Sequence, residues 1–238
     1  MKEIWILAKR ELQSFFDSLV AYVIMILFLG FSGFFTWLST NNVFYIGQAT
    51  LTVFFSVAYW SLFFFIPALT MKLLAEEKRS GTIELLLTKS INDRQVVVGK
   101  FLAALMLITI ALAFTLPYAI SVSSIGNLDL GATVTGYLGL FLMSAAYISI
   151  GLFASSITNN QIVAFMISIF ISLFFHIIFG VISRGMTGGI GQFFDGLSLQ
   201  THYESISRGV IDTRDLIYFL SITFAGLFFT EISLAKRN

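Results

Sequence analysis

The chain has 238 residues, of which 57% are hydrophobic and 11% charged, and its formal net charge is +1. Soluble domains carry about 25% charged residues, so the composition excludes an ordinary soluble domain and indicates an all-α integral membrane protein. The charge balance offers no basic stripe for nucleic acid, and the absence of cysteine excludes disulfides and thiolate metal sites.

The first predicted element is an amphipathic helix over residues 2–18. Its apolar residues recur at helical spacing, whereas Lys2, Lys9 and Arg10 fall on the other face. This pattern is typical of a helix lying in the cytoplasmic membrane interface. The alternative is an N-terminal extension of the first membrane span.

Six stretches follow that are long and apolar enough to cross a bilayer, which takes roughly 20 residues. Eleven of the fourteen lysines and arginines lie before the first stretch, between the second and third or at the start of the third, or after the last. The positive-inside rule therefore predicts a multi-pass protein with both termini in the cytoplasm. We expect one membrane domain over residues 1–238, with spans at about 19–40, 49–71, 97–124, 132–156, 161–182 and 216–234.

Both prolines of the chain fall within predicted spans, Pro67 in the second and Pro117 in the third. Each removes a backbone hydrogen bond and is expected to kink its helix. The kinks could serve movement of these helices or only the shape of their packing.

The stretch between spans two and three, AEEKRSGTIELLLTKSI at residues 75–91, is unusually polar. Gly81 permits a sharp turn, Thr82 can cap a new helix, and Glu84 would lie in its first turn. Asn92 and Gln95 are spaced as a capping box for the helix that enters span three. The sequence predicts a short stiff cytoplasmic helix; a helix resting on anionic lipid is the alternative.

The remaining connections differ in length. Residues 157–160 form a short polar joint before span five, where Asn159, Asn160 and Gln161 are candidate helix caps. Residues 183–215 form a long segment on the outer side, where glycines and then spaced apolar residues predict short re-entrant or amphipathic helices.

The sequence lacks the motifs of several membrane machines. No phosphate-binding G-x-x-x-x-G-K-[ST] pattern occurs, so any ATP hydrolysis belongs to another chain. His176 in span five is expected to donate to a neighbouring carbonyl, because no carboxylate lies at its depth. The sequence His202-Tyr203-Glu204 is better explained as a helix or loop surface than as a metal site, and ion-coupled transport is disfavoured.

Three segments resemble the permease subunits of ABC-2-type (type V exporter-like) transporters. They are PALTMKLLAEEKRSGTIELLLTKSINDRQVVVGK, GLFASSITNNQIVAF and THYESISRGVIDTRDLIYFLS, at residues 67–100, 151–165 and 201–221. The last segment is most similar to the permease of gliding-motility-associated ABC transporters.

The resemblance implies a non-enzymatic exporter subunit of the bacterial inner membrane that binds no cofactor itself. ATP and magnesium would bind a cytoplasmic ABC ATPase, in two copies. A second permease, either a different chain with a periplasmic domain or another copy of this one, would share a path lined by spans two and five. The implied ATPase contacts are Glu76, Glu77, Gly81, Thr82, Glu84, Leu85 and Leu86. The main rival is a membrane scaffold that anchors a surface complex without transport; a carrier that works without ATP is a third option.

Overall fold

The computed structural model describes residues 2–39, 43–82 and 92–236, and every regular element in these ranges is helical. Six described segments are long and apolar enough to span a membrane, which confirms the expected all-helical fold. They are Val20–Trp37, Thr52–Ser80, Asp93–Ile125, Leu130–Ser156, Gln161–Gly185 and Thr213–Ala235.

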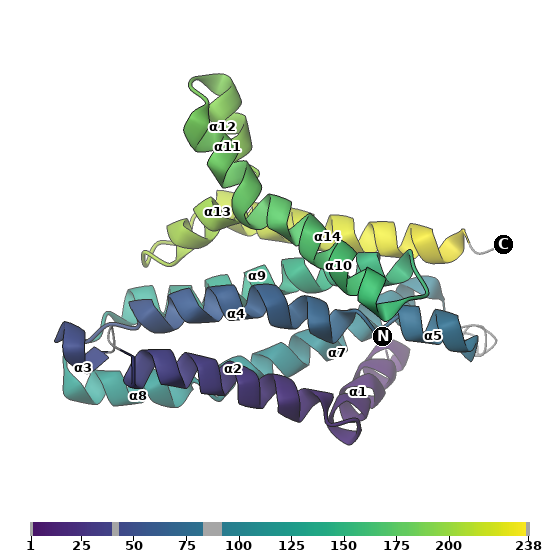
Figure 1. The fold of residues 1–238 in the computed structure, drawn as a ribbon, viewed down its shortest axis with the longest axis horizontal. Helices are drawn as coiled ribbons and strands as arrows, with labels where there is room; N and C mark the ends of the chain where they lie inside the picture. The colour runs from purple at the N-terminus through teal and green to yellow at the C-terminus, as the bar shows by residue number, and fades with distance from the viewer. Residues whose placement is uncertain (1, 40–42, 83–91, 237–238) are drawn as a thin grey trace.

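The N-terminal helix α1 (Lys2–Asp17) is separate from α2 (Val20–Trp37), the first long apolar helix. Leu19 between them has φ 61°, a left-handed conformation that ends one helix and redirects the chain. In Figure 1, α1 lies at a steep angle to α2. Helix α1 is therefore not continuous with α2, and its apolar face packs against α7 (Asp93–Ala113). A short helix, α3 (Val43–Ile46), follows α2.

The second span begins as α4 (Thr52–Thr70), passes through a turn at residues 71–74 and continues as the polar α5 (Ala75–Ser80). Pro67 lies inside α4, four residues before the turn. The third span consists of α7 (Asp93–Ala113) and α8 (Leu116–Ile125). Pro117 is near the start of α8, and the Thr115 hydroxyl donates to the Leu112 carbonyl beside this break.

The long helix α9 (Leu130–Ser156) is the centre of the bundle. It contacts α4, α7, α10 (Gln161–Leu173), α13 (Leu199–Ile206) and α14 (Thr213–Ala235). Small residues let its neighbours approach closely. A Cβ added at Gly151 would lie 2.0 Å from the Thr70 Oγ1 atom of α4. Helices α4 and α9 therefore meet at a point that only glycine fits.

The fifth span contains α10 (Gln161–Leu173), a π-helical turn η1 (Phe174–Ile178) and α11 (Phe179–Gly185). Asn160 caps α10 as predicted, accepting from the Ile162 N–H at 2.9 Å. The expectation for His176 was wrong in its partner: its Nδ1 meets the Tyr147 hydroxyl of α9, not a carbonyl. The partner of His176 is thus a buried tyrosine hydroxyl on a neighbouring helix and not a backbone carbonyl close to it in the chain.

The segment before the last span folds as α12 (Gly189–Asp195) and α13 (Leu199–Ile206), which confirms short helices there. Figure 1 shows α11 and α12 projecting sideways from the bundle, whereas α13 lies along it. His202 belongs to α13, where Nδ1 pairs with Asp215 Oδ1 at 2.6 Å and fastens α13 to α14.

The two ends of the bundle differ in character. Helices α1 and α5 and the end of α14 gather at one end, and α3 and the end of α8 lie at the other (Figure 1). The polar elements that the sequence singled out are therefore collected at a single end.

Candidate functional site

Helix α5 carries the described part of the polar stretch, and its end is shaped by Gly81. This residue has φ 68°, the left-handed conformation in which glycine ends helices without steric cost. Just beyond it, the Thr82 hydroxyl lies 2.9 Å from the Ser80 hydroxyl. Both Gly81 and Thr82 are exposed, so α5 presents its last turn to the surroundings.

The junction between α4 and α5 is held by Ser155 of α9. Its hydroxyl accepts from the Leu74 and Ala75 N–H groups at 3.1 and 2.9 Å and donates to the Met71 carbonyl at 2.9 Å. The turn between the helices leaves these backbone groups without partners in α4 or α5. One buried side chain therefore satisfies the turn and ties it to the central helix.

A second tie joins α5 to α9 one turn later. The Lys78 ammonium donates to the Ser156 carbonyl at the C-terminal end of α9. Cations are favoured at this end of a helix, where the last carbonyls lack intrahelical partners. Together with Ser155, this contact fixes α5 to the end of α9 from which the chain continues into α10.

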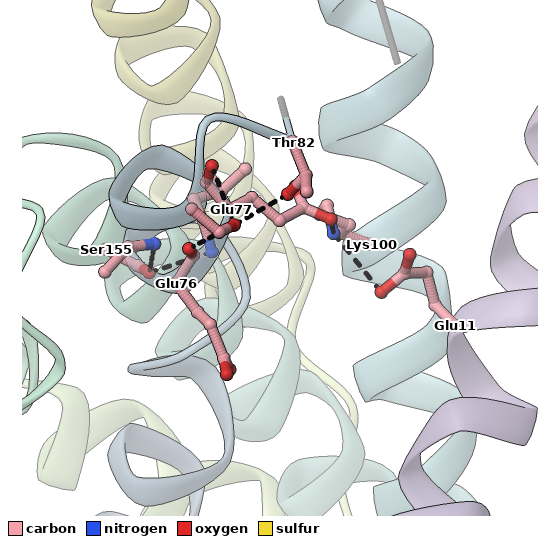
Figure 2. A network of polar contacts seen from close by, with 9 residues as sticks. Glu11, Glu76, Glu77, Thr82, Lys100 and Ser155 are labelled. Carbon is pink, nitrogen blue, oxygen red and sulfur yellow. Dashed lines mark hydrogen bonds and ion pairs between the residues drawn. The ribbon is translucent and has the colours of Figure 1, made fainter. Parts of the chain in front are cut away.

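The centre of the site is a buried lysine between two carboxylates (Figure 2). The Lys100 ammonium of α7 lies 2.7 Å from Glu77 Oε1 of α5 and 3.2 Å from Glu11 Oε2 of α1. The Lys100 side chain is 1% exposed, and those of Glu77 and Glu11 are 19% and 13% exposed. A buried charge is tolerated only when it is paired, so this triad binds three helices into one unit.

Helices α1 and α7 are also joined at the beginning of α7. The capping box predicted for Asn92 and Gln95 is confirmed, and Gln95 Nε2 also donates to Glu3 Oε2 at 2.7 Å. A polar groove of about 220 Å³ lies between α1, α5 and α7, with Arg10, Glu76 and Thr82 among its lining residues. The end of the molecule that carries α5 is thus a braced and mainly polar surface.

The sequence predicted the same role for Glu76 and Glu77, but their carboxylates point in different directions in the structure. Glu76 is exposed, and Figure 2 shows its carboxylate turned away from Lys100. The Glu77 carboxylate points inward and is bound to Lys100 within the chain. Glu84, Leu85 and Leu86 lie outside the described residues.

Sequence reasoning missed three residues of this site: Glu11, Lys100 and Ser155. A signal was present for Lys100, because it stands between VVVG and FLAAL, with apolar residues on both sides. A lysine in such surroundings requires a counter-charge. Nothing in the sequence identifies Glu11 and Glu77 as that counter-charge, since both come from distant elements.

These observations define a class: an all-helical, multi-pass membrane protein with a braced polar helix at the end of its second span. Residues 38–208 match the family model described as ABC-2 family transporter protein. The chain belongs to this family and is a permease rather than a catalytic subunit. No curated protein matches the chain.

Permeases of the ABC-2 family work with ABC ATPases, which supply the nucleotide chemistry. Within the described part of this chain, no group of three histidine, aspartate or glutamate side chains could hold a metal ion. The polar side chains at this site make the ion pairs and hydrogen bonds described above.

Proposed function

We propose that this permease is the membrane subunit of an ATP-driven exporter and that residues 75–91 contact a separate cytoplasmic ATPase. The observation that carries the proposal is the Glu11–Lys100–Glu77 triad, supported by the bonds of Ser155. A force applied to α5 would be transmitted to α1, α7 and α9 through the ion pairs and hydrogen bonds that join these helices.

The division of roles within the polar stretch follows from side-chain direction. Glu76, Gly81 and Thr82 are exposed and contact the ATPase in this proposal, together with Glu84, Leu85 and Leu86. Glu77 acts from within, by holding α5 against α7. ATP-driven closure of two ATPase copies would push this region, and spans two and three would tilt to change access.

The proposed orientation places α1, α5 and both termini on the cytoplasmic side of a bacterial inner membrane. This orientation is supported by the positive-inside rule, because eleven of the fourteen basic residues fall in the segments that it places on the cytoplasmic side. A second permease chain would complete the transport path, with spans two and five facing it. The similarity of residues 201–221 to gliding-motility permeases further suggests that the exporter serves gliding or cell-surface assembly.

The test is ATP turnover by the complex purified with its ATPase. Glu76→Lys and Glu84→Lys should lower turnover and weaken ATPase binding, because each reverses a charge on the proposed contact surface. Asp17→Lys is the matched control, since Asp17 is an exposed carboxylate at the end of α1. If both test variants bind and cycle like the control, the contact assignment is wrong; a scaffold would show no turnover linked to these residues.

The motility role has its own test. Deletion of the chain in its native cell should abolish surface gliding, and expression of the wild-type chain should restore it. Normal gliding after deletion would leave the permease function standing but remove the motility role.

A further inference from the structure

A cavity of about 340 Å³ lies at the end of the bundle opposite α5, between α4, α9 and α13. Its volume is within the range of about 300–1,000 Å³ that is usual for small-molecule sites. Aromatic side chains form much of its wall: Phe55, Tyr59, Trp60 and Tyr203. Such walls favour a ligand with an apolar or cationic part.

Among the described residues that line the cavity, Glu204 is the one that carries a charge. Gln200 donates to Glu204 Oε1 at 2.7 Å, which holds the carboxylate in place. The other polar lining groups are the side chains of Thr52, Ser56, Thr133 and Ser207. A wall with a carboxylate and no basic residue disfavours phosphates and other anions.

Two tyrosine hydroxyls at this cavity lack hydrogen-bond partners. Tyr59 and Tyr203 are each 6% exposed, and their rings stack with centroids 4.9 Å apart. Neither hydroxyl has a partner in the described structure, although buried polar groups are nearly always bonded. Both oxygens are inaccessible to solvent, so the two tyrosines line the cavity through their other atoms.

We propose that this cavity binds the primary ammonium group of an amphiphile. The Glu204 carboxylate neutralises the ammonium, and the aromatic side chains of the wall add cation–π attraction. The inference rests on the proposed transport function and names a substrate class for it. The ammonium could belong to a lipid headgroup or to a free amphiphilic amine.

The cavity is connected to span five by a stack of rings. Tyr59 stacks on His176 at 4.3 Å between centroids, and His176 stacks in turn on Phe63 at 4.5 Å. His176 belongs to the π-helical turn η1, a type of irregularity that often occurs at functional sites. A ligand that moves Tyr59 would therefore act directly on this turn.

The test measures binding of hexylammonium chloride to the chain in phosphatidylcholine nanodiscs by calorimetry, with empty discs as the blank. Saturable binding is expected, with much weaker binding of hexanol and hexyl sulfate. Glu204→Gln removes the charge of an exposed carboxylate but keeps an acceptor oxygen, so it should weaken binding roughly 2- to 5-fold. Tyr203→Phe and Tyr59→Phe keep the rings that line the cavity and should leave binding close to that of the wild type.

Glu231→Gln is the matched control. It also removes one negative charge, but Glu231 lies near the end of α14 and does not line the cavity. Its affinity should equal that of the wild type. Equal binding of hexanol, unchanged affinity in Glu204→Gln, or displacement by octyl glucoside at a similar concentration would overturn the proposal. The last result would indicate a neutral carbohydrate site.

The source of the ammonium is decided by native mass spectrometry of chain purified from phosphatidylethanolamine membranes. A phosphatidylethanolamine adduct that is lost in Glu204→Gln identifies a lipid headgroup; hexylammonium binding without this adduct identifies a free amine. The assays need no ATPase. Failure here with turnover still sensitive to Glu76→Lys would therefore reject the ligand and leave the transport proposal intact.

Discussion

Replacing Lys100 tests the central contact of the molecule. Lys100→Met keeps an unbranched side chain one atom shorter and removes its charge, which leaves the Glu11 and Glu77 carboxylates facing each other. Removing one partner of a buried ion pair costs about 3–5 kcal/mol. We expect about 3 kcal/mol, the lower end of that range, because the two carboxylates retain 13% and 19% exposure and can draw in water.

Thermal unfolding of the purified chain measures this effect. For a chain of this size, each kcal/mol shifts the midpoint by about 2–4 °C, so a decrease of roughly 6–12 °C is expected. Lys72→Met is the control: Lys72 donates to the Ser18 hydroxyl at 3.4 Å, and its loss should cost less than about 1 kcal/mol.

A compensating variant separates loss of charge balance from loss of packing. Adding Glu11→Gln and Glu77→Gln to Lys100→Met removes all three charges and should restore a large part of the midpoint. If Lys100→Met unfolds like the wild type, the triad does not hold these helices together. If the triple variant is no better than the single one, packing rather than charge explains the loss.

Three further predictions concern single contacts, each measured by thermal unfolding in the same detergent. Ser155→Ala leaves three backbone groups of the α4–α5 turn unsatisfied and should lower the free energy of unfolding by about 1–3 kcal/mol. An unchanged unfolding midpoint would indicate that water takes the place of the hydroxyl. Gly151→Ala should cost about 1–3 kcal/mol because its Cβ would overlap Thr70. Gly30→Ala, with open space around the added Cβ, should be neutral or stabilising, and equal effects at both glycines would refute the close contact. Tyr203→Phe removes a buried hydroxyl that has no partner among the described residues. The free energy of unfolding should stay unchanged or rise by up to about 1 kcal/mol. A clear decrease in this free energy would show that the hydroxyl is bonded.

Much of the fold could be predicted because its signals are local. A bilayer demands about 20 apolar residues per helix, so hydropathy alone identified six spans. The caps at Asn92 and Asn160 depend on side chains within three residues of the backbone groups they satisfy. The separation of α1 from α2 was favoured by amphipathic spacing, although the left-handed Leu19 was not foreseen.

The candidate site was only partly predictable. The polar stretch and the turn at Gly81 were visible as composition and a glycine. The different directions of Glu76 and Glu77 were not, because side-chain direction depends on what neighbouring helices present. The partner assignments for the site remain predictions.

The sequence by itself determined the membrane class, the number of spans and the position of the polar helix, because these follow from solvation and local backbone bonding. Only the tertiary structure decided which distant groups meet: Lys100 with Glu11 and Glu77, Ser155 with the α4–α5 turn, and Tyr59 with His176. The physical reason is that a buried polar group requires a partner but does not specify which one. Helix packing makes that choice.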